Sequence, residues 1–202
     1  MSTATTRPFL VAALIFVCLS SDGISHPHVF VDAELTIVFD GQGLAGFRQR
    51  WVFDEMFSST MLSNFDKNND HSLDVHEVEE IKKGGFSNLR NYGYFTHILI
   101  DGKKFDVNYV TEFSAEAHDN RLLYTFFVPC HVAAAEQFKH VTISLFDETY
   151  YTDVALLHDS LSCEGDSTFV VTYEIKRIKE FSFYYGQVIP DGVSIQFKRN
   201  HE

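Results

Sequence analysis

Residues 29–53, VFVDAELTIVFDGQGLAGFRQRWVF, contain two β-rich runs joined by a turn. The runs are residues 29–39 and 47–53, and the Asp-Gly-Gln-Gly sequence at 40–43 is typical of a tight turn. Trp51 and the phenylalanines of the second run indicate that one side of it is buried. We therefore predict that this segment forms a β-hairpin.

Beyond residue 95 the chain consists of short β-rich runs separated by turns, a spacing typical of a sandwich or barrel. No repeat or linker divides the chain, so we predict one mainly β (α+β) domain at residues 26–202, with an antiparallel β-sandwich-like fold. The 20 Phe and 9 Tyr residues supply its core and rims. The expected strands are residues 95–100, 105–113, 121–128, 141–146, 150–156, 168–175 and 193–197.

Two short segments between the hairpin and these strands have the apolar periodicity of helices. They are residues 54–65 and 75–83, and the pair of glycines at 84–85 ends the second one. We predict that residues 54–85 form a helix-loop-helix inserted into the β domain.

The loop between these helices, DKNNDHSLDVHE at residues 66–77, has oxygen-bearing residues at the calcium-ligand positions of an EF-hand. Ca²⁺ is a hard cation that prefers oxygen ligands, and the glutamate at the twelfth position can chelate it with both carboxylate oxygens. The predicted ligands are Asp66, Asn68, Asp70, the backbone carbonyl of Ser72, Asp74 and Glu77.

The sixth loop position departs from the pattern, because His71 replaces the glycine that makes the sharp turn with positive φ. Histidine enters this region at a cost of roughly 1 kcal/mol, so the loop is weakened but still able to bind. A second loop, which calcium sensors usually have, is missing from the sequence. We expect an ion that braces the fold, and the alternative is an acidic surface loop that binds nothing.

The amino terminus has the features of a secretory signal peptide at residues 1–25. Arg7 precedes the apolar run 9–19, and the small residues Gly23 and Ser25 fit a cleavage site. The run is too short to span a membrane, which takes about 20 apolar residues. We predict export to the periplasm, cleavage before His26 and no stable membrane insertion afterwards.

Cleavage there would expose the sequence His-Pro-His, in which His26 and His28 point to the same side of an extended chain. Their imidazoles, with or without the new α-amine, suit zinc, nickel, cobalt or copper. The alternative is a frayed, solvated terminus that binds no metal. Further histidines that could complete a site are His97, His118, His131, His140 and His158.

The composition and the remaining motifs exclude several functions. A net charge of −12 argues against nucleic-acid binding. The literal G-x-G-x-x-G at residues 41–46 is followed by a strand, so it lacks the helix that a dinucleotide site needs. Hydrolase motifs of the G-x-S-x-G and H-E-x-x-H types are missing from the sequence.

In the oxidising compartment of an exported protein, we expect Cys130 and Cys163 to form a disulfide.

A set of motifs resembles a bacterial family of unknown function. The motifs are HPHVFVD at 26–32, Trp51 with FDE at 53–55, the loop at 66–77, and LFDETYY at 145–151. Members of that family are described as periplasmic components of an uncharacterised ABC-type transport system, often beside nickel/cobalt or zinc permeases. The resemblance implies traffic of metal ions in the periplasm.

Three functional hypotheses follow. In the first, a non-enzymatic accessory protein captures zinc or nickel/cobalt at His26 and His28 for an inner-membrane metal permease, and Ca²⁺ braces its helical insertion. In the second, His26 belongs to a copper histidine brace that activates oxygen. In the third, the protein is a calcium-stabilised structural or interaction domain and its terminal histidines have no role.

Overall fold

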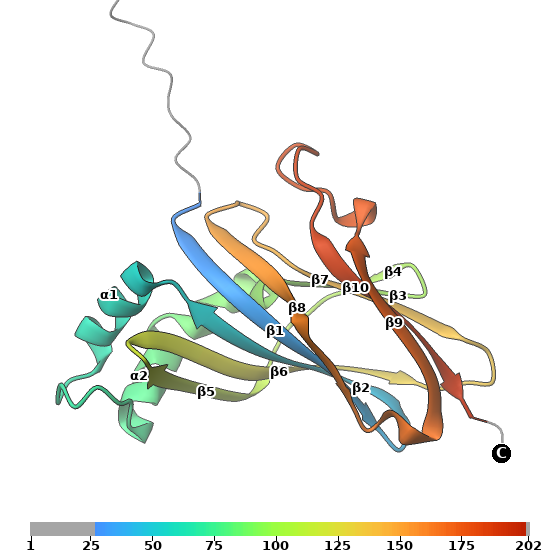
Figure 1. Cartoon of the computed structure of the whole chain (residues 1–202), viewed down its shortest axis with the longest axis horizontal. Coiled ribbons are helices and arrows are strands. Elements are labelled where there is room, and N and C mark those ends of the chain that lie inside the picture. Colours follow the sequence, from blue (N-terminus) through green and yellow to red (C-terminus); the bar gives the residue numbers. More distant parts are fainter. Residues whose placement is uncertain (1–26, 201–202) are drawn as a thin grey trace, which may run out of the picture.

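Two five-stranded sheets form the body of the protein, and a short helical unit lies beside them (Figure 1). The computed structural model describes residues 27–200. The first sheet has the strand order β5-β6-β2-β1-β8 and the second β4-β3-β7-β10-β9. The strands are β1 Val29–Asp40, β2 Gly43–Phe53, β3 Thr96–Ile100, β4 Lys103–Phe105, β5 Thr111–His118, β6 Arg121–Ala133, β7 Lys139–Leu145, β8 Thr152–Glu164, β9 Phe169–Arg177 and β10 Asp191–Arg199.

The expected hairpin is confirmed, because β1 and β2 pair antiparallel from Val31 opposite Phe53 to Asp40 opposite Gly43. The Asp40 carboxylate accepts the N–H groups of Gln42 and Gly43 and so fixes the turn. Gly43 has a φ of +152°, and a Cβ there would lie 2.3 Å from the carbonyl oxygen of Val132 on β6. Glycine is therefore required where β6 joins the hairpin.

The mainly β, sandwich-like fold is confirmed, but the first sheet is mixed and not purely antiparallel. Strand β8 pairs with β1 in parallel, from Thr152 opposite Val29 to Glu164 opposite Val38. After β7 the chain leaves the second sheet through residues 146–151 and enters the first sheet at the end where β1 begins. The N–H groups of His28 and Val29 both donate to the carbonyl of Tyr151, which places the two strand starts side by side.

The expected strand at residues 105–113 is wrong, because it is divided between the two sheets. Strand β4 ends at Phe105 in the second sheet, and β5 begins at Thr111 in the first. Residues 106–110 cross between the sheets without regular secondary structure. The polar Asp106 and Asn108 interrupt the β pattern there, and the Asn108 amide donates to the Asp106 carbonyl.

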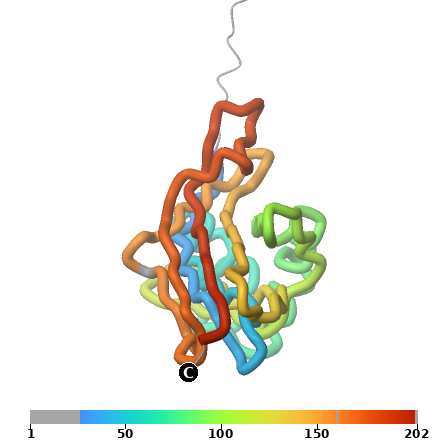
Figure 2. The backbone as a smooth tube through the Cα atoms, turned by 90° about the vertical axis from the view of Figure 1, so that its right-hand side faces the viewer, coloured from blue at the N-terminus to red at the C-terminus, as the bar shows by residue number. Residues whose placement is uncertain are grey.

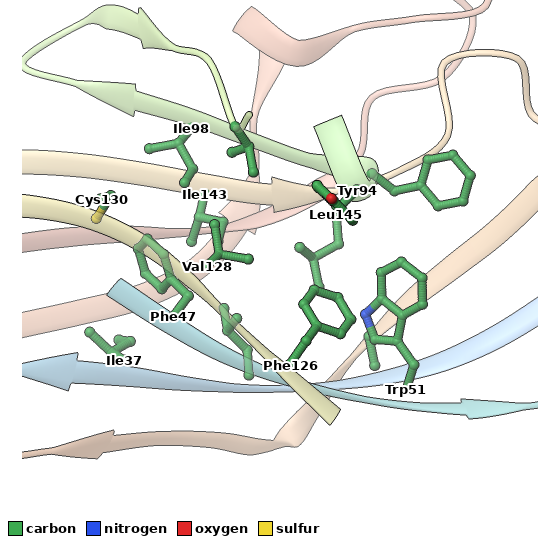
Figure 3. Packing of buried hydrophobic residues seen from close by; sticks show 14 of the residues in the cluster. Ile37, Phe47, Trp51, Tyr94, Ile98, Phe126, Val128, Cys130, Ile143 and Leu145 are labelled. Carbon is green, nitrogen blue, oxygen red and sulfur yellow. The ribbon is translucent and has the colours of Figure 1, made fainter. Parts of the chain in front are cut away.

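Apolar faces of the two sheets meet in a single core (Figure 3). Ile37, Phe47 and Val128 of the first sheet face Ile98 and Ile143 of the second, and all five are fully buried. In β1 and in the second half of β2, buried side chains alternate with partly or fully exposed ones, so one side of these strands faces the core.

Helices α1 (Glu55–Phe65) and α2 (Val75–Gly84) contact β6 and β5 at one end of the first sheet. They are followed by a distorted 3₁₀ segment, Phe86–Phe95, which we label η1 and which the sequence did not predict. Figure 2 shows this green segment beside the strands as a layer of its own. Within residues 27–200, no helix is long and apolar enough to cross a bilayer.

The expected disulfide is absent, because Cys130 and Cys163 are both free thiols. They lie on β6 and β8, which are separated in the sheet by β2 and β1. Three strand spacings of about 4.8 Å put their backbones roughly 14 Å apart, whereas a disulfide needs a Cα separation below about 7 Å. Burial raises the pKa of Cys130 to about 12 and that of Cys163 to about 11, so both remain protonated thiols.

Candidate functional site

The loop between α1 and α2 begins and ends where an EF-hand loop would. Asp66 caps the carboxyl end of α1, and its N–H donates to the Leu62 carbonyl. Asp74 caps the amino end of α2 by accepting the N–H groups of His76 and Glu77. Positions one and nine of the predicted loop are therefore the two helix caps.

The loop bends around the side chain of Asp66, which is only 7% exposed. One carboxylate oxygen accepts the N–H of Asp70 at 3.2 Å, and the other accepts the N–H of His71 at 3.1 Å. His71 has a φ of +64°, which is the left-handed conformation expected at the sixth position of the loop. The backbone thus makes the required turn with histidine in place of glycine.

Glu77 connects the two ends of the loop, and its side chain is also buried, at 4% exposure. Oε1 accepts the N–H of Lys67 at 2.7 Å, and Oε2 accepts the N–H of Asp74 at 3.0 Å. With Asp74 it forms a capping box, in which each side chain accepts the other residue's backbone N–H. Both oxygens of this carboxylate therefore face the loop backbone.

The exposed part of the loop holds the remaining predicted ligands. Asn68 Oδ1 accepts the N–H of Asp70 at 2.8 Å, and Asp70 Oδ1 accepts both the hydroxyl and the N–H of Ser72. These hydrogen bonds from Ser72, together with one from Asn68, hold the pKa of Asp70 below its usual value. The side chain is therefore a carboxylate at neutral pH.

The donor set fits a hard cation in its chemistry. Within residues 27–200, Asp66, Asp70, Asp74 and Glu77 form none of the ion pairs of the structure, and the ammonium group of Lys67 donates to the Asn64 carbonyl. In that same part of the chain, no three His, Cys, Asp or Glu side chains are grouped closely enough to hold a metal. The carboxylates are bonded to backbone N–H groups instead.

Of the two amino-terminal histidines, His26 lies outside the described residues. His28 precedes β1 and is exposed, and its ring centroid lies 5.0 Å from that of Tyr151. His118, His131, His140 and His158 are exposed on four different strands. Over the described range none of them joins His28 in a group of three possible ligands.

His97 differs from the other histidines within residues 27–200 because it is largely buried. Its ring stacks on Phe146 with centroids 3.7 Å apart, and Nε2 lies 3.1 Å from the Phe146 carbonyl oxygen. Glu148 lies 3.8 Å from Nδ1. Burial lowers the pKa of His97 below its usual 6.5, and the Phe146 carbonyl and Glu148 oppose this effect only in part.

We expect this histidine to make stability depend on pH. Below about pH 6.5 the unfolded chain takes up a proton that the folded protein resists. The free energy of unfolding therefore falls as the pH decreases from that value towards the lower pKa of the folded state. Urea unfolding at a series of pH values should show a weaker fall for His97→Phe, while His118→Gln on the surface should behave as wild type. If the free energy of unfolding falls with pH equally steeply in the wild type and in His97→Phe, His97 does not cause the pH dependence.

The sequence did not predict an apolar pocket of about 410 Å³ between the helical unit and the first sheet. Its walls include residues from β2, α1 and η1 and from the turn before β8. The sequence feature that comes nearest to predicting this pocket is the apolar periodicity of residues 54–65. That pattern predicts a helix with a buried face, but it does not predict a cavity beneath the helix.

Comparison with known proteins gives the family. The model of a family described as "Protein of unknown function (DUF1007)" matches residues 11–170. The chain belongs to the DUF1007 family. An uncharacterised 15.5 kDa protein from the trpE 3′ region of Spirochaeta aurantia is 30% identical over 136 residues, which cover 64% of this chain and 93% of that relative. An uncharacterised protein of Haemophilus influenzae is 26% identical over 154 residues, which cover 74% of this chain and 70% of that relative.

Proposed function

We propose that this DUF1007 protein is a periplasmic metal-binding accessory protein for transition-metal transport, with Ca²⁺ bound at residues 66–77. The observation that carries the calcium part is the pair of buried carboxylates of Asp66 and Glu77, neither of which forms an ion pair within residues 27–200. Buried charges are costly unless they are paired, and a divalent cation would supply the missing charge.

The role of Ca²⁺ in this proposal is structural. Asp66 ends α1 and Glu77 lies in the first turn of α2, so one ion between them would fix the angle between the helices. Binding requires these carboxylates to exchange some of their backbone N–H partners for the ion. The α1–α2 unit would then be stabilised over the end of the first sheet, where it packs on β6 and β5.

The transition-metal part of the proposal rests on His26 and His28. The backbone of His28 is tied to Tyr151, so the imidazole is presented at a defined place at the end of the sandwich. Zinc, nickel, cobalt or copper would bind through the imidazoles, and the receiving partner would be an inner-membrane metal permease. The signal-like amino terminus and the family resemblance support a periplasmic location. No catalytic residue is assigned.

The decisive experiment is a titration of the exported, metal-free protein with Zn²⁺, Ni²⁺, Cu²⁺ and Ca²⁺ by calorimetry. We expect a His26→Ala/His28→Ala variant to lose the transition-metal site, with affinity falling at least about tenfold, and to keep calcium binding. The matched control is His118→Ala/His158→Ala, which removes two exposed histidines elsewhere.

If transition metals bind equally well to wild type and to the His26/His28 variant, the transport role is wrong. A calcium-stabilised interaction domain would then account for the protein if calcium still binds. Mass spectrometry of the exported chain must also give an amino terminus that retains His28.

A further inference from the structure

We infer that the apolar pocket beneath α1 and η1 is a binding site for a small organic cation with an apolar body, such as a substituted ammonium compound. This goes beyond the metal sites, because the pocket contains none of the proposed metal ligands. Three features of the pocket support it: the volume, the aromatic walls and, among the lining residues of the described range 27–200, the single charged side chain.

The pocket has the size of a small-molecule site. Its volume of about 410 Å³ lies within the range of about 300–1,000 Å³ that is usual for ligand pockets. Its walls include Trp51 and Phe53 from β2, Phe57 from α1, and Phe86 and Phe95 from η1. All five side chains belong to the hydrophobic core or pack against it.

Aromatic side chains form much of the pocket wall, and their rings pack against one another. The Phe53 ring lies 4.7 Å from Phe57, and the Trp51 ring stacks on Phe95 with centroids 6.0 Å apart. The faces of aromatic rings carry a partial negative charge, which attracts cations, and Trp is the strongest of them in this respect. Aromatic walls therefore favour an apolar cation over an anion of the same size.

The charged residue in the lining is Asp147, at the turn that precedes β8. It is 3% exposed, and within residues 27–200 it is in none of the ion pairs of the structure. Oδ1 accepts the N–H and hydroxyl of Thr149, whereas Oδ2 accepts, from residues 27–200, the N–H of Thr152 alone, at 3.1 Å. A carboxylate oxygen can accept a second bond, so Oδ2 retains capacity for a ligand.

These features specify the ligand. A cation whose apolar body fills the aromatic part of the pocket would pair its charge with Asp147 where water is scarce, and there the attraction is stronger than at the surface. A neutral analogue would gain only the apolar contacts. An anionic analogue would be repelled by Asp147 and by the ring faces. The expected order of affinity is therefore cation, neutral molecule, anion.

Three benzyl compounds test this order on the full exported chain with calcium present: benzylammonium, benzyl alcohol and phenylacetate. Calorimetry should give an affinity for the cation about tenfold or more above that for benzyl alcohol, and no binding of phenylacetate. The chain has a single tryptophan, and because Trp51 lines the pocket, its fluorescence should change on binding.

Two variants locate the site. Asp147→Asn should bring the cation to within about twofold of benzyl alcohol without changing the affinity for benzyl alcohol. Asp119→Asn is the matched control, because Asp119 is exposed in the turn between β5 and β6 and does not line the pocket. This variant should bind as wild type. Met61→Trp places a larger side chain in the wall from α1 and should abolish binding of both compounds even if Asp147→Asn fails to fold.

Three results would overturn the inference. One is equal binding of all three compounds, which would make the pocket a general apolar site. Another is cation binding that survives Met61→Trp, which would indicate adsorption to an acidic surface. The last is the lack of any binding to the folded wild-type protein. None of these depends on whether the loop at residues 66–77 binds calcium.

Discussion

Glu77→Gln is expected to lower calcium affinity by roughly two orders of magnitude and to abolish the rise in melting temperature that we expect Ca²⁺ to produce in the wild type. The glutamate at the twelfth loop position normally binds calcium with both oxygens and a full negative charge, whereas an amide offers one neutral oxygen. Calorimetry and thermal unfolding, each with calcium and with a chelator, measure both effects.

Glu79→Gln provides the matched control on the same helix. Glu79 is exposed and lies 3.7 Å from the ammonium groups of Lys82 and Lys83, so its loss should cost only a few tenths of a kcal/mol. Its calcium affinity should equal that of the wild type. Unchanged calcium binding in Glu77→Gln would instead show that the ion does not bind in this loop.

A second variant separates strain in the loop from calcium binding. His71 adopts a φ of +64°, which costs an L-residue about 1 kcal/mol more than glycine. Because the loop backbone in this structure already makes the turn, the cost is the same with and without calcium. His71→Gly should therefore raise the free energy of unfolding by about 1 kcal/mol and leave calcium affinity within about twofold of the wild type. A large change in calcium affinity would show that the loop adopts this turn only with the ion.

Gln49→Leu is expected to lower the free energy of unfolding by about 2–4 kcal/mol, although leucine has a similar volume. Gln49 is fully buried between the two sheets. Its Oε1 accepts the indole N–H of Trp51 at 2.9 Å, and its amide donates to the Thr96 hydroxyl at 2.9 Å. The Thr96 hydroxyl in turn donates to the Tyr94 carbonyl. Leucine would leave the indole N–H buried without an acceptor.

A double-mutant cycle isolates this bond. Trp51→Phe removes the indole N–H, so Gln49→Leu should cost at least about 1 kcal/mol less in that background than in the wild type. Unfolding in urea is best followed by circular dichroism, because Trp51 is the chain's single tryptophan. Additive effects would show that the bond from Trp51 to Gln49 contributes nothing to stability.

Features decided by neighbouring residues were predicted correctly. The hairpin at 29–53 follows from alternation and a turn whose Asp40 side chain bonds to the adjacent backbone. The helix-loop-helix follows from Asp66 and Asp74, since each caps a helix through groups within five residues of itself. Even the positive φ of His71 was expected from its position in the loop.

Features decided by distant residues were missed or predicted wrongly. Whether residues 105–113 remain in one sheet depends on which sheet each half joins, and the pattern of β residues is the same in either case. The parallel pairing of β8 with β1 joins residues more than a hundred positions apart. The cysteines were expected to pair because of the oxidising compartment, but strand order keeps them separate.

The amino-acid sequence alone was sufficient to indicate a β-rich chain and an acidic twelve-residue loop between two helices. These depend on local periodicity and on side chains that bond to their own backbone. Tertiary structure alone decided the order of strands, the buried pairing of Gln49 with Trp51, and the aromatic pocket with Asp147 in its wall. Each of these brings together groups from strands and helices far apart in the sequence, and only the packing of the whole core determines which of them meet.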